Sequence, residues 1–470
     1  MAGASGRAAP TLGWDTVFGI RIADANACIA RAESYPKQFD IADPKDQLAA
    51  AGSFGPWALA LGGSDSLINM SLPVPLVKIT LPTGQTETID KVDVTATVRM
   101  NLIPSAAAFS TGRAQALVIW NGAPPGDQAV TVGKIDYAGG KPSFLAEAAF
   151  RELITAWLAG NLGAFDHVFA SVNLDRQAAK VYQWLQPTTT SYAYVDLKTE
   201  QDGVLAVLSM TGGRSPSGLI QQVSNNIVPV GAKAGFLISA QRVMEEILLP
   251  SMPQVFPGSS IRDFKLSADG LSIENAHNDI QFAVHDRKNG KTYAAFVETL
   301  QVTLVDQELQ MNVITRTNVS PGIRAMCHTI DALSLKLVQK KSGPSGEQTF
   351  NFVPARAPDV NHWLDIDPGI KIAQDVLAIV TLVIVLIAAV LTDGAALLVV
   401  AAIIGFVAGV MMITEGIIGL VDTDDAPAIT DLVMNSTAPI RWRDARDFRA
   451  TWAGFNESLQ IVGDPNFSTA

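Results

Sequence analysis

The sequence predicts an α+β protein in which antiparallel strands outnumber helices, with an apolar helical hairpin inserted near the C-terminus. Three observations lead to this fold class: segments that alternate apolar and polar residues, turn dipeptides between such segments, and one stretch almost free of polar side chains. The chain has 470 residues. A usual domain has roughly 150 residues, so we expect two or three units.

The strand signal is clearest in residues 91–100, where Val92, Val94 and Val98 alternate with polar neighbours. This period of two places the apolar side chains on one face of a strand. Turn dipeptides join further pairs of such segments: Asp202-Gly203 joins 192–198 to 204–210, Asp269-Gly270 joins 264–266 to 271–273, and Asn289-Gly290 joins 280–285 to 291–297. These dipeptides suit tight hairpins, so we expect an antiparallel meander that continues through 299–305 and 309–316.

Three amphipathic segments, residues 143–159, 175–185 and 239–249, predict helices packed on the sheet. The first begins at Ser143, a favourable N-cap residue. One face of this first helix is predicted to bury Leu145, Ala149, Leu153, Ala156 and Trp157. The third helix is predicted to expose the charged side chains Arg242, Glu245 and Glu246.

The most apolar part of the chain, residues 376–418, predicts a helical hairpin. Residues 376–391 contain one polar side chain, Thr381, and residues 395–413 contain none. Gly394 lies in the short connection between them, which favours a helix end and two antiparallel helices. A helix that is apolar on every side must be buried in protein or in lipid, and both alternatives fit the sequence.

We expect this hairpin to make the membrane or lipid contact. Its arms have about 16 and 19 residues, close to the roughly 20 that a bilayer span requires. The side chains predicted to contact lipid are Val380, Leu382, Val385, Leu386, Leu398, Val400, Ile403 and Phe406. The small residues Ala401, Gly405 and Gly409 recur every four positions, which predicts close helix packing.

Composition and motifs favour a binding protein over an enzyme. The net charge is −11, and the basic residues form no run, so nucleic acid is not an expected partner. Cys28 and Cys327 are far apart, and the five histidines are scattered. No nucleotide, metal or hydrolase motif is present. We therefore expect no catalytic residue, no metal and no cofactor.

The first twenty residues lack the charged start and apolar stretch of a secretory signal. We therefore expect synthesis in the cytoplasm, with later release and membrane association left open. The acidic chain offers no polybasic anchor for anionic lipid. Membrane contact is thus expected to depend on apolar burial.

Three stretches of the chain carry a resemblance to a known family. They are GWDTVF with RIADAN (13–18 and 21–26), GFLISAQRVMEEILLPSMPQVF (235–256) and RATWAGFNESLQIVGDP (449–465). Together they resemble the bacterial tubular lipid-binding (TULIP) proteins related to the forty-seven-kilodalton protein of the orfX-type botulinum neurotoxin gene cluster. The resemblance implies a long curved antiparallel sheet wrapped around long helices, an apolar groove that binds lipid, and association with toxin genes.

The residue patterns and the resemblance together predict three parts of the chain. Residues 13–355 are predicted to form a tubular lipid-binding body of one or two lobes, 356–424 a linker and the apolar hairpin, and 425–470 a segment that returns to the body. The expected function is that of a lipid- or hydrophobic-ligand-binding accessory protein acting at membranes, with toxin-cluster proteins as partners. The alternatives are a membrane-inserting or pore-forming component that uses residues 376–418, and a subunit of a larger assembly.

Overall fold

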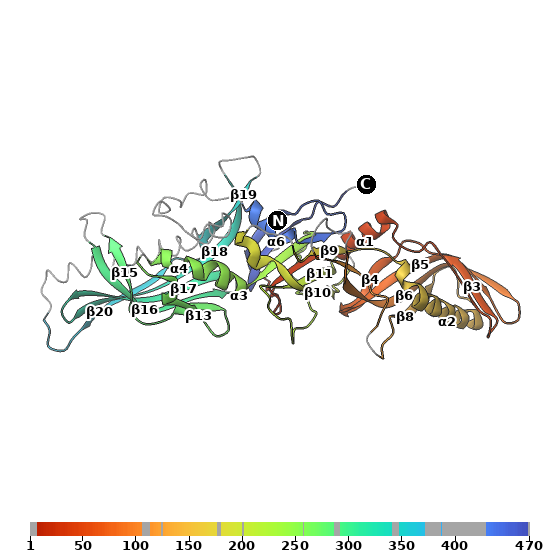
Figure 1. Ribbon diagram of the computed structural model, residues 1–470, viewed down its shortest axis with the longest axis horizontal. Helices are drawn as coiled ribbons and strands as arrows, with labels where there is room; N and C mark the ends of the chain where they lie inside the picture. The colour runs from red at the N-terminus through yellow and green to blue at the C-terminus, as the bar shows by residue number, and fades with distance from the viewer. Residues whose placement is uncertain are drawn as a thin grey trace.

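The computed structural model is elongated, with strands running along most of its length (Figure 1). It describes residues 7–105, 113–123, 126–175, 180–199, 202–256, 258–285, 292–340, 347–371, 387 and 429–468. The described strands form a 15-stranded and an 8-stranded sheet, and their pairings are antiparallel. The predicted dominance of antiparallel sheet is therefore confirmed.

The first lobe, at the right of Figure 1, is a long helix on long strands. Its elements are β2 (Gln38–Asp43), β3 (Leu48–Ser53), β4 (Ala58–Asp65), β5 (Leu67–Thr80), β6 (Thr86–Pro104), β7 (Ala114–Ile119), β8 (Val130–Tyr137) and α2 (Phe144–Asn161). Val92, Val94 and Val98 of β6 are buried together with Ala96, while Asp93, Thr95 and Thr97 are not, as their alternation predicts. Ser143 caps α2, because its Oγ accepts a hydrogen bond from the backbone N–H of Ala146 at 3.2 Å.

The helix α2 buries a different stripe from the predicted one. Leu145 and Ala156 are exposed, so their predicted burial is wrong. The buried side chains are Ala146, Ala149, Phe150, Leu153, Ile154, Trp157 and Leu158. Aromatic packing explains why this face of α2 is buried. The ring centroids of Phe150 and Trp157 lie 6.3 and 6.0 Å from that of Phe39.

The central part joins the two lobes, and several of its strands are buried on both faces. Its strands are β1 (Thr16–Arg21), β9 (Ala170–Asn173), β10 (Pro187–Val195), β11 (Val204–Thr211), β12 (Ala234–Ser239), β22 (Arg449–Phe455) and β23 (Ser458–Asp464). Two short helices, α1 (Ile22–Ala32) and η1 (Leu162–Ala164), belong to the same region. The strand β1 pairs with β11 and with β12, and β10 pairs with β11 as its Asp-Gly connection predicts.

The segment between β11 and β12 covers one face of this central sheet. Trp14, Val223 and Ile227 pack there in an apolar cluster. The guanidinium of Arg21 holds the segment in place, donating to the carbonyls of Val228 at 2.6 Å and Pro229 at 2.7 Å. The arginine thereby pairs the backbone carbonyls of this turn, and no carboxylate among the described residues forms an ion pair with it.

The second lobe, at the left of Figure 1, contains the eight-stranded sheet. Its strands are β13 (Phe264–Leu266), β14 (Ser272–Asn275), β15 (Ile280–His285), β16 (Thr292–Val305), β17 (Glu308–Ser320), β18 (Ile323–Gln339), β19 (Gln348–Pro354) and β20 (Asp359–Ile366). The predicted meander is confirmed, because β13 pairs with β14, β15 with β16 and β16 with β17. Residues 359–366, assigned to a linker from the sequence, form the strand β20 on β18.

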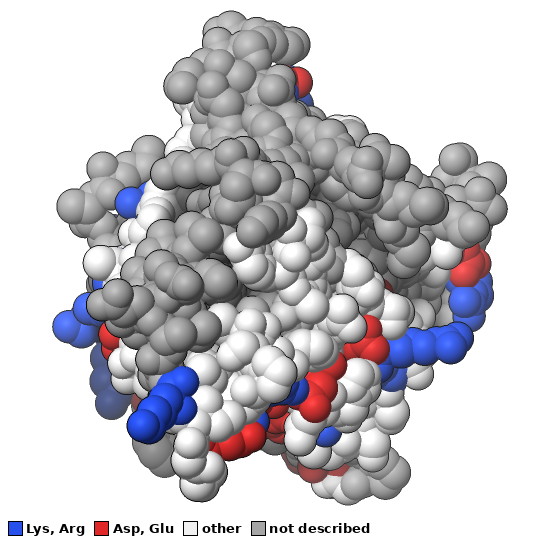
Figure 2. Space-filling view, turned by 90° about the vertical axis from the view of Figure 1, so that its left-hand side faces the viewer, with Lys and Arg blue, Asp and Glu red and all other residues white. Residues whose placement is uncertain are grey.

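Seen from its end, this lobe carries acidic and basic side chains next to one another, with mostly uncharged described surface between them (Figure 2). Ion pairs join neighbouring segments of this lobe. Arg316 contacts Glu298 at 2.8 Å, and Arg324 contacts Asp365 and Asp367, each at 2.7 Å. Arg316 also contacts Asp279, so each arginine faces two carboxylates and each cluster carries one net negative charge.

The helical segment that enters the second lobe is irregular. It consists of α3 (Ala240–Val243), the π-helical turn η3 (Met244–Leu248) and α4 (Leu249–Val255), and η4 (Ile261–Asp263) follows. Ser239 caps the segment, and Pro253 lies inside α4. Arg242 is buried, so its predicted exposure is wrong. Burial is possible because its guanidinium contacts Glu245 at 2.7 Å and Glu246 at 3.0 Å.

Two other predicted helical segments are not seen as predicted: one is shorter, and the other lies outside the described residues. Of the helix predicted at 175–185, residues 180–185 form the 3₁₀ helix η2 (Lys180–Leu185). The apolar hairpin predicted at 376–418 lies outside the described residues, apart from Ile387, which is helical and buried. After it come α6 (Thr430–Thr437) and β21 (Ile440–Trp442), and β21 pairs with β9.

Candidate functional site

The side chains predicted to contact lipid or to pack helices, from Val380 to Gly409, lie outside the described residues. Their roles therefore stay predictions. Among the helices that the structure describes, none has both the length and the apolar character required to cross a membrane.

A pocket of about 250 Å³ lies where the C-terminal segment meets the central sheet. We call it the Trp442 pocket. Its apolar lining includes Phe18 from β1, Met434 from α6, Trp442 from β21 and the nearby Phe448. The ring of Phe18 meets those of Trp442 and Phe448 edge-on, with centroid distances of 6.0 and 5.6 Å. These contacts fix the rings as one rigid aromatic wall.

Backbone pairing positions the residues of this wall. Trp442 is held by β21, in which it pairs with Ala170 of β9. The chain then folds back, because Ala445 forms an isolated bridge with Phe467 and the N–H of Arg446 donates to the carbonyl of Pro465 at 3.3 Å. Segments from three parts of the sequence therefore converge on the Trp442 pocket.

The polar lining combines two guanidinium groups with one carboxylate: Arg441, Arg446 and Asp447. Nε of Arg446 donates to Oγ of Ser468 at 3.2 Å. Nδ2 of Asn466 donates to Oδ1 of Asp447 at 2.6 Å. The carboxylate thus has a neutral amide partner.

The indole nitrogen of Trp442 adds a hydrogen-bond donor to the region. Trp442 is only 1% exposed, and its Nε1 has no hydrogen-bond acceptor within the described part of the chain. A buried polar group without a partner costs about 1–3 kcal/mol.

A serine and a histidine that are distant in the sequence meet elsewhere, near the central sheet. Oγ of Ser34 lies 2.6 Å from Nδ1 of His167. His167 is 1% exposed and packs edge-on against Phe169. Burial, with a smaller effect of the positive charge of Arg443, lowers the pKa of His167 to about 4. The imidazole is thus neutral and enclosed, which favours a packing role over attack on a substrate.

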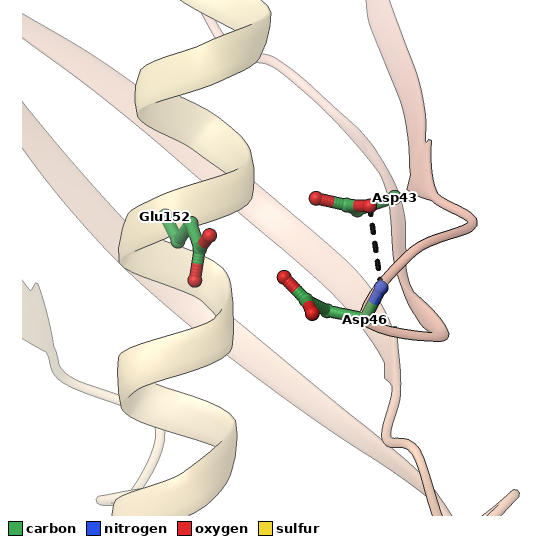
Figure 3. A group of neighbouring side chains, drawn as sticks. All are labelled: Asp43, Asp46 and Glu152. Carbon is green, nitrogen blue, oxygen red and sulfur yellow. Dashed lines mark hydrogen bonds between the residues drawn. The ribbon is translucent and has the colours of Figure 1, made fainter.

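Three carboxylates cluster near the first lobe's helix. Figure 3 shows Asp43, the last residue of β2, and Asp46, from the turn that follows, facing Glu152 of α2. Their nearest oxygens lie within 4.8 Å of one another. Oδ1 of Asp43 accepts hydrogen bonds from the backbone N–H groups of Lys45 at 2.9 Å and Asp46 at 3.3 Å, as a turn-forming aspartate does. The cluster is explained by the turn and by solvent, and we assign no metal to it.

The Trp442 pocket was not predicted from the sequence. Phe18 lies in the stretch GWDTVF, while Trp442 and Phe448 lie in RWRDARDF near the other end of the chain. The one local signal is that the second stretch alternates arginines with acidic and aromatic residues. Nothing in either stretch indicates that the two meet.

Comparisons with known proteins connect the whole chain to one family. The family model described as OrfX-like, Protein OrfX2/OrfX3/P47, matches residues 11–463. The chain is 29% identical to Protein OrfX3 of Paraclostridium bifermentans, with 97% of this chain and 99% of that protein covered. Two solved structures of P47 from Clostridium botulinum are similar in fold. The A2 protein has a TM-score of 0.66 at 15% identity, covering 97% of this chain and 98% of the other, and the E1 protein has 0.63 at 16%, covering 97% and 100%.

Proposed function

The chain belongs to the OrfX-like family, and from this premise we propose that it is an accessory protein that binds lipid or another hydrophobic ligand. The family is associated with botulinum toxin gene clusters. We propose that the partners of this chain are toxin-cluster proteins and that it acts at membranes. Its mode of action is binding and not catalysis.

The observation that carries this proposal is the Trp442 pocket. Phe18, Phe448 and Met434 offer apolar surface at a concave site, where burial of a hydrocarbon group releases about 25 cal/mol per Å² of apolar surface removed from water. Met434 is 53% exposed although it lines the pocket, so part of this apolar surface is open to solvent. Bound hydrocarbon would cover it.

We further propose a TULIP-like arrangement in which the sheets wrap around the helices. In support, α2 packs against β2, β3, β5 and β8 in the first lobe, and α4 packs against β13 in the second. Each lobe thus places a helix along a sheet. A family-wide groove would follow these helices, and the Trp442 pocket would be one part of the ligand-binding surface.

The experiment is native mass spectrometry of the purified full chain, followed by extraction and identification of bound lipid. We expect mass adducts that disappear after extraction and return when phospholipid vesicles are supplied. A chain that carries no lipid and takes none from vesicles would overturn the proposal.

The apolar sequence 376–418 supports a second candidate function, membrane insertion or pore formation. Release of dye from vesicles by the same preparation would favour this function over simple carriage. A stable complex with toxin-cluster proteins, without lipid uptake or leakage, would instead favour the third possibility, a subunit of a larger assembly.

A further inference from the structure

The strand β20 lies at an edge of the eight-stranded sheet, at the left of Figure 1. On one side it pairs with β18 over all eight of its residues, from Asp359 opposite Ile330 to Ile366 opposite Ile323, without a register shift. No described strand pairs with its other side. A regular edge of this kind presents a row of backbone N–H and C=O groups to which another strand can add.

The side chains of β20 are exposed on both faces of the strand. None of its residues is buried, and its apolar side chains Val360 and Trp363 are 36% and 41% exposed. In the same sheet, β17 buries every second residue from Leu309 to Thr317. The strand β20 also contains no lysine, proline or bulge, the features with which many edge strands prevent pairing. Trp363 therefore offers a large ring beside a regular strand edge.

The charges along this edge are mostly negative. Asp359, Trp363 and Asp365 lie on one face of the strand, because every second residue points the same way. Asp365 and Asp367 share the guanidinium of Arg324, each at 2.7 Å, and Asp359 forms no ion pair with a described residue. Two basic residues are near in the sequence but outside the strand: Arg356, which is paired with Glu308, and Lys371. The strand itself thus carries two carboxylates and no cation.

These charges disfavour a second copy of the chain as the added strand. In a symmetric antiparallel pair one residue lies opposite itself, and two registers keep most of β20 paired. With Trp363 at the centre, Asp359 lies opposite Asp367 of the second copy. With His362 at the centre, Asp359 lies opposite Asp365 of the second copy. Both registers place like charges directly opposite each other, which destabilises a strand pair.

We propose that the outer edge of β20 binds an extended basic segment of a partner protein, which joins the sheet as an antiparallel strand. Basic side chains of the segment face Asp359 and Asp365, and an apolar or aromatic side chain faces Trp363. Opposite residues of antiparallel strands run in reverse order, so the segment has the pattern basic-x-apolar-x-x-x-basic. The inference rests on the proposed function in expecting a protein partner, and it needs no lipid.

The test is fluorescence anisotropy of a labelled peptide, TKTYTTTKT, titrated with the full chain. The peptide has the expected pattern, and threonine favours an extended backbone at the other positions. Two controls are TETYTTTET, in which the charges are reversed, and TKTYPPTKT, in which one of the two prolines must remove a hydrogen bond to the edge. We expect the basic peptide to bind at least about tenfold more tightly than either control. Equal binding of the acidic peptide would overturn the charge preference, and equal binding of the proline peptide would overturn strand addition.

Two variants with a control locate the site. Asp359→Asn should weaken binding of the basic peptide about two- to fivefold, because one pair of opposite charges is lost. Trp363→Thr should weaken it by about the same factor, and both side chains are exposed, so circular dichroism should show an unchanged fold. Asp40→Asn removes an exposed carboxylate from β2, an edge strand of the other sheet, and should change nothing. The peptide should also slow hydrogen exchange in residues 359–366, and unchanged exchange there would overturn the proposed site.

The rival occupant and the proposed function are tested separately. Light scattering of the eluted full chain detects a dimer, and a dimer that Trp363→Thr dissociates would overturn the basic partner in favour of a second copy. Lipid adducts are measured on the chain without peptide, and peptide binding is measured without lipid. A chain that takes up lipid but does not prefer the basic peptide would overturn this inference alone, and the reverse result would overturn only the lipid proposal.

Discussion

The two lobes place a helix against a sheet in different ways. In the first lobe α2 is a single helix of 18 residues, capped by Ser143 and packed through apolar side chains. In the second, residues 240–255 are divided by a π-helical turn, contain Pro250 and Pro253, and begin with a buried arginine. The comparison indicates that similar packing is stabilised by apolar burial in one lobe and partly by ionic contacts in the other.

The ring cluster explains the regularity of α2. Phe39, Phe54 and Trp157 lie within 6.0 Å of one another by ring centroids. Such rings stabilise the fold mainly through the apolar area that they bury, and close packing leaves little room for an irregular helix turn beside them. A continuous helix is therefore the arrangement that fills this lobe.

The contacts of Arg242 explain the other lobe. Its guanidinium lies 5.6 Å from the centre of the Trp184 ring and donates to the carbonyl of Trp184 at 3.0 Å. Glu245 and Glu246 complete its partners, and burial raises the pKa of Glu246 despite the positive charge of Arg242. Because its charge is paired, Arg242 can be buried in the first turn of this helical segment, next to the central sheet.

The largest expected effect is that of Phe150→Ala in the first lobe. Phe150 is fully buried, so the substitution should lower the free energy of unfolding by about 3–5 kcal/mol through lost burial and a cavity. Hydrogen–deuterium exchange should rise in β2, β3 and β8 but not in β16–β18. The matched control is Phe144→Ala on the same helix, where Phe144 is 87% exposed and the change should stay within about 0.5 kcal/mol. Equal effects of the two substitutions would contradict the assigned face of α2.

A smaller effect is expected from Arg242→Gln in the second lobe. The side chains of Glu245 and Glu246 reach solvent, so they are not left fully buried when the guanidinium is removed, and we expect a loss of about 2 kcal/mol. Arg113→Gln is the control, because Arg113 makes a comparable ion pair with Asp175 at an exposed site, worth at most about 1 kcal/mol. Urea denaturation measures both. The ionic account of this lobe fails if the buried and the exposed substitution cost the same.

The smallest effect is a difference in pH dependence between the two histidines His167 and His277. The pKa of His167 is lowered to about 4 by burial, so the unfolded chain binds the proton more readily between pH 6.5 and 4. Its stabilising contribution is complete above pH 6.5 and is lost as the pH falls. His167→Gln should therefore reduce the loss of stability between pH 7 and pH 5 by about 1–2 kcal/mol.

His277 is the control with the opposite sign. Its pKa is raised by hydrogen bonds to the carbonyl of Asn278 and to Asp263, so its contribution is present at low pH and is lost as the pH rises through the raised pKa. His277→Gln should slightly increase the loss of stability on acidification. Unfolding curves at pH 7 and pH 5 measure both variants, and a change of the same sign in both would contradict the assignment.

The sequence by itself determined the features that depend on neighbouring residues. The alternation around Val94 predicts a strand with one buried face, Gly270 in an Asp-Gly pair predicts the β13–β14 hairpin, and Ser143 predicts the start of α2. The causes are the alternation of apolar residues, the positive φ that glycine adopts and the capping hydroxyl of serine. Each of them acts over only a few residues. The family resemblance added the expectation that this antiparallel sheet is long and curved.

Only the tertiary structure decided which apolar and charged side chains are buried and which distant groups meet. Leu145 is exposed although its helix is amphipathic, because the rings around Phe39 select another face of α2. Arg242 is buried because two carboxylates and an indole surround it. The Trp442 pocket exists because Phe18 of β1 packs against Trp442 of β21, although seven strands separate β1 from β21 in the sheet order. No local propensity encodes such a long-range contact.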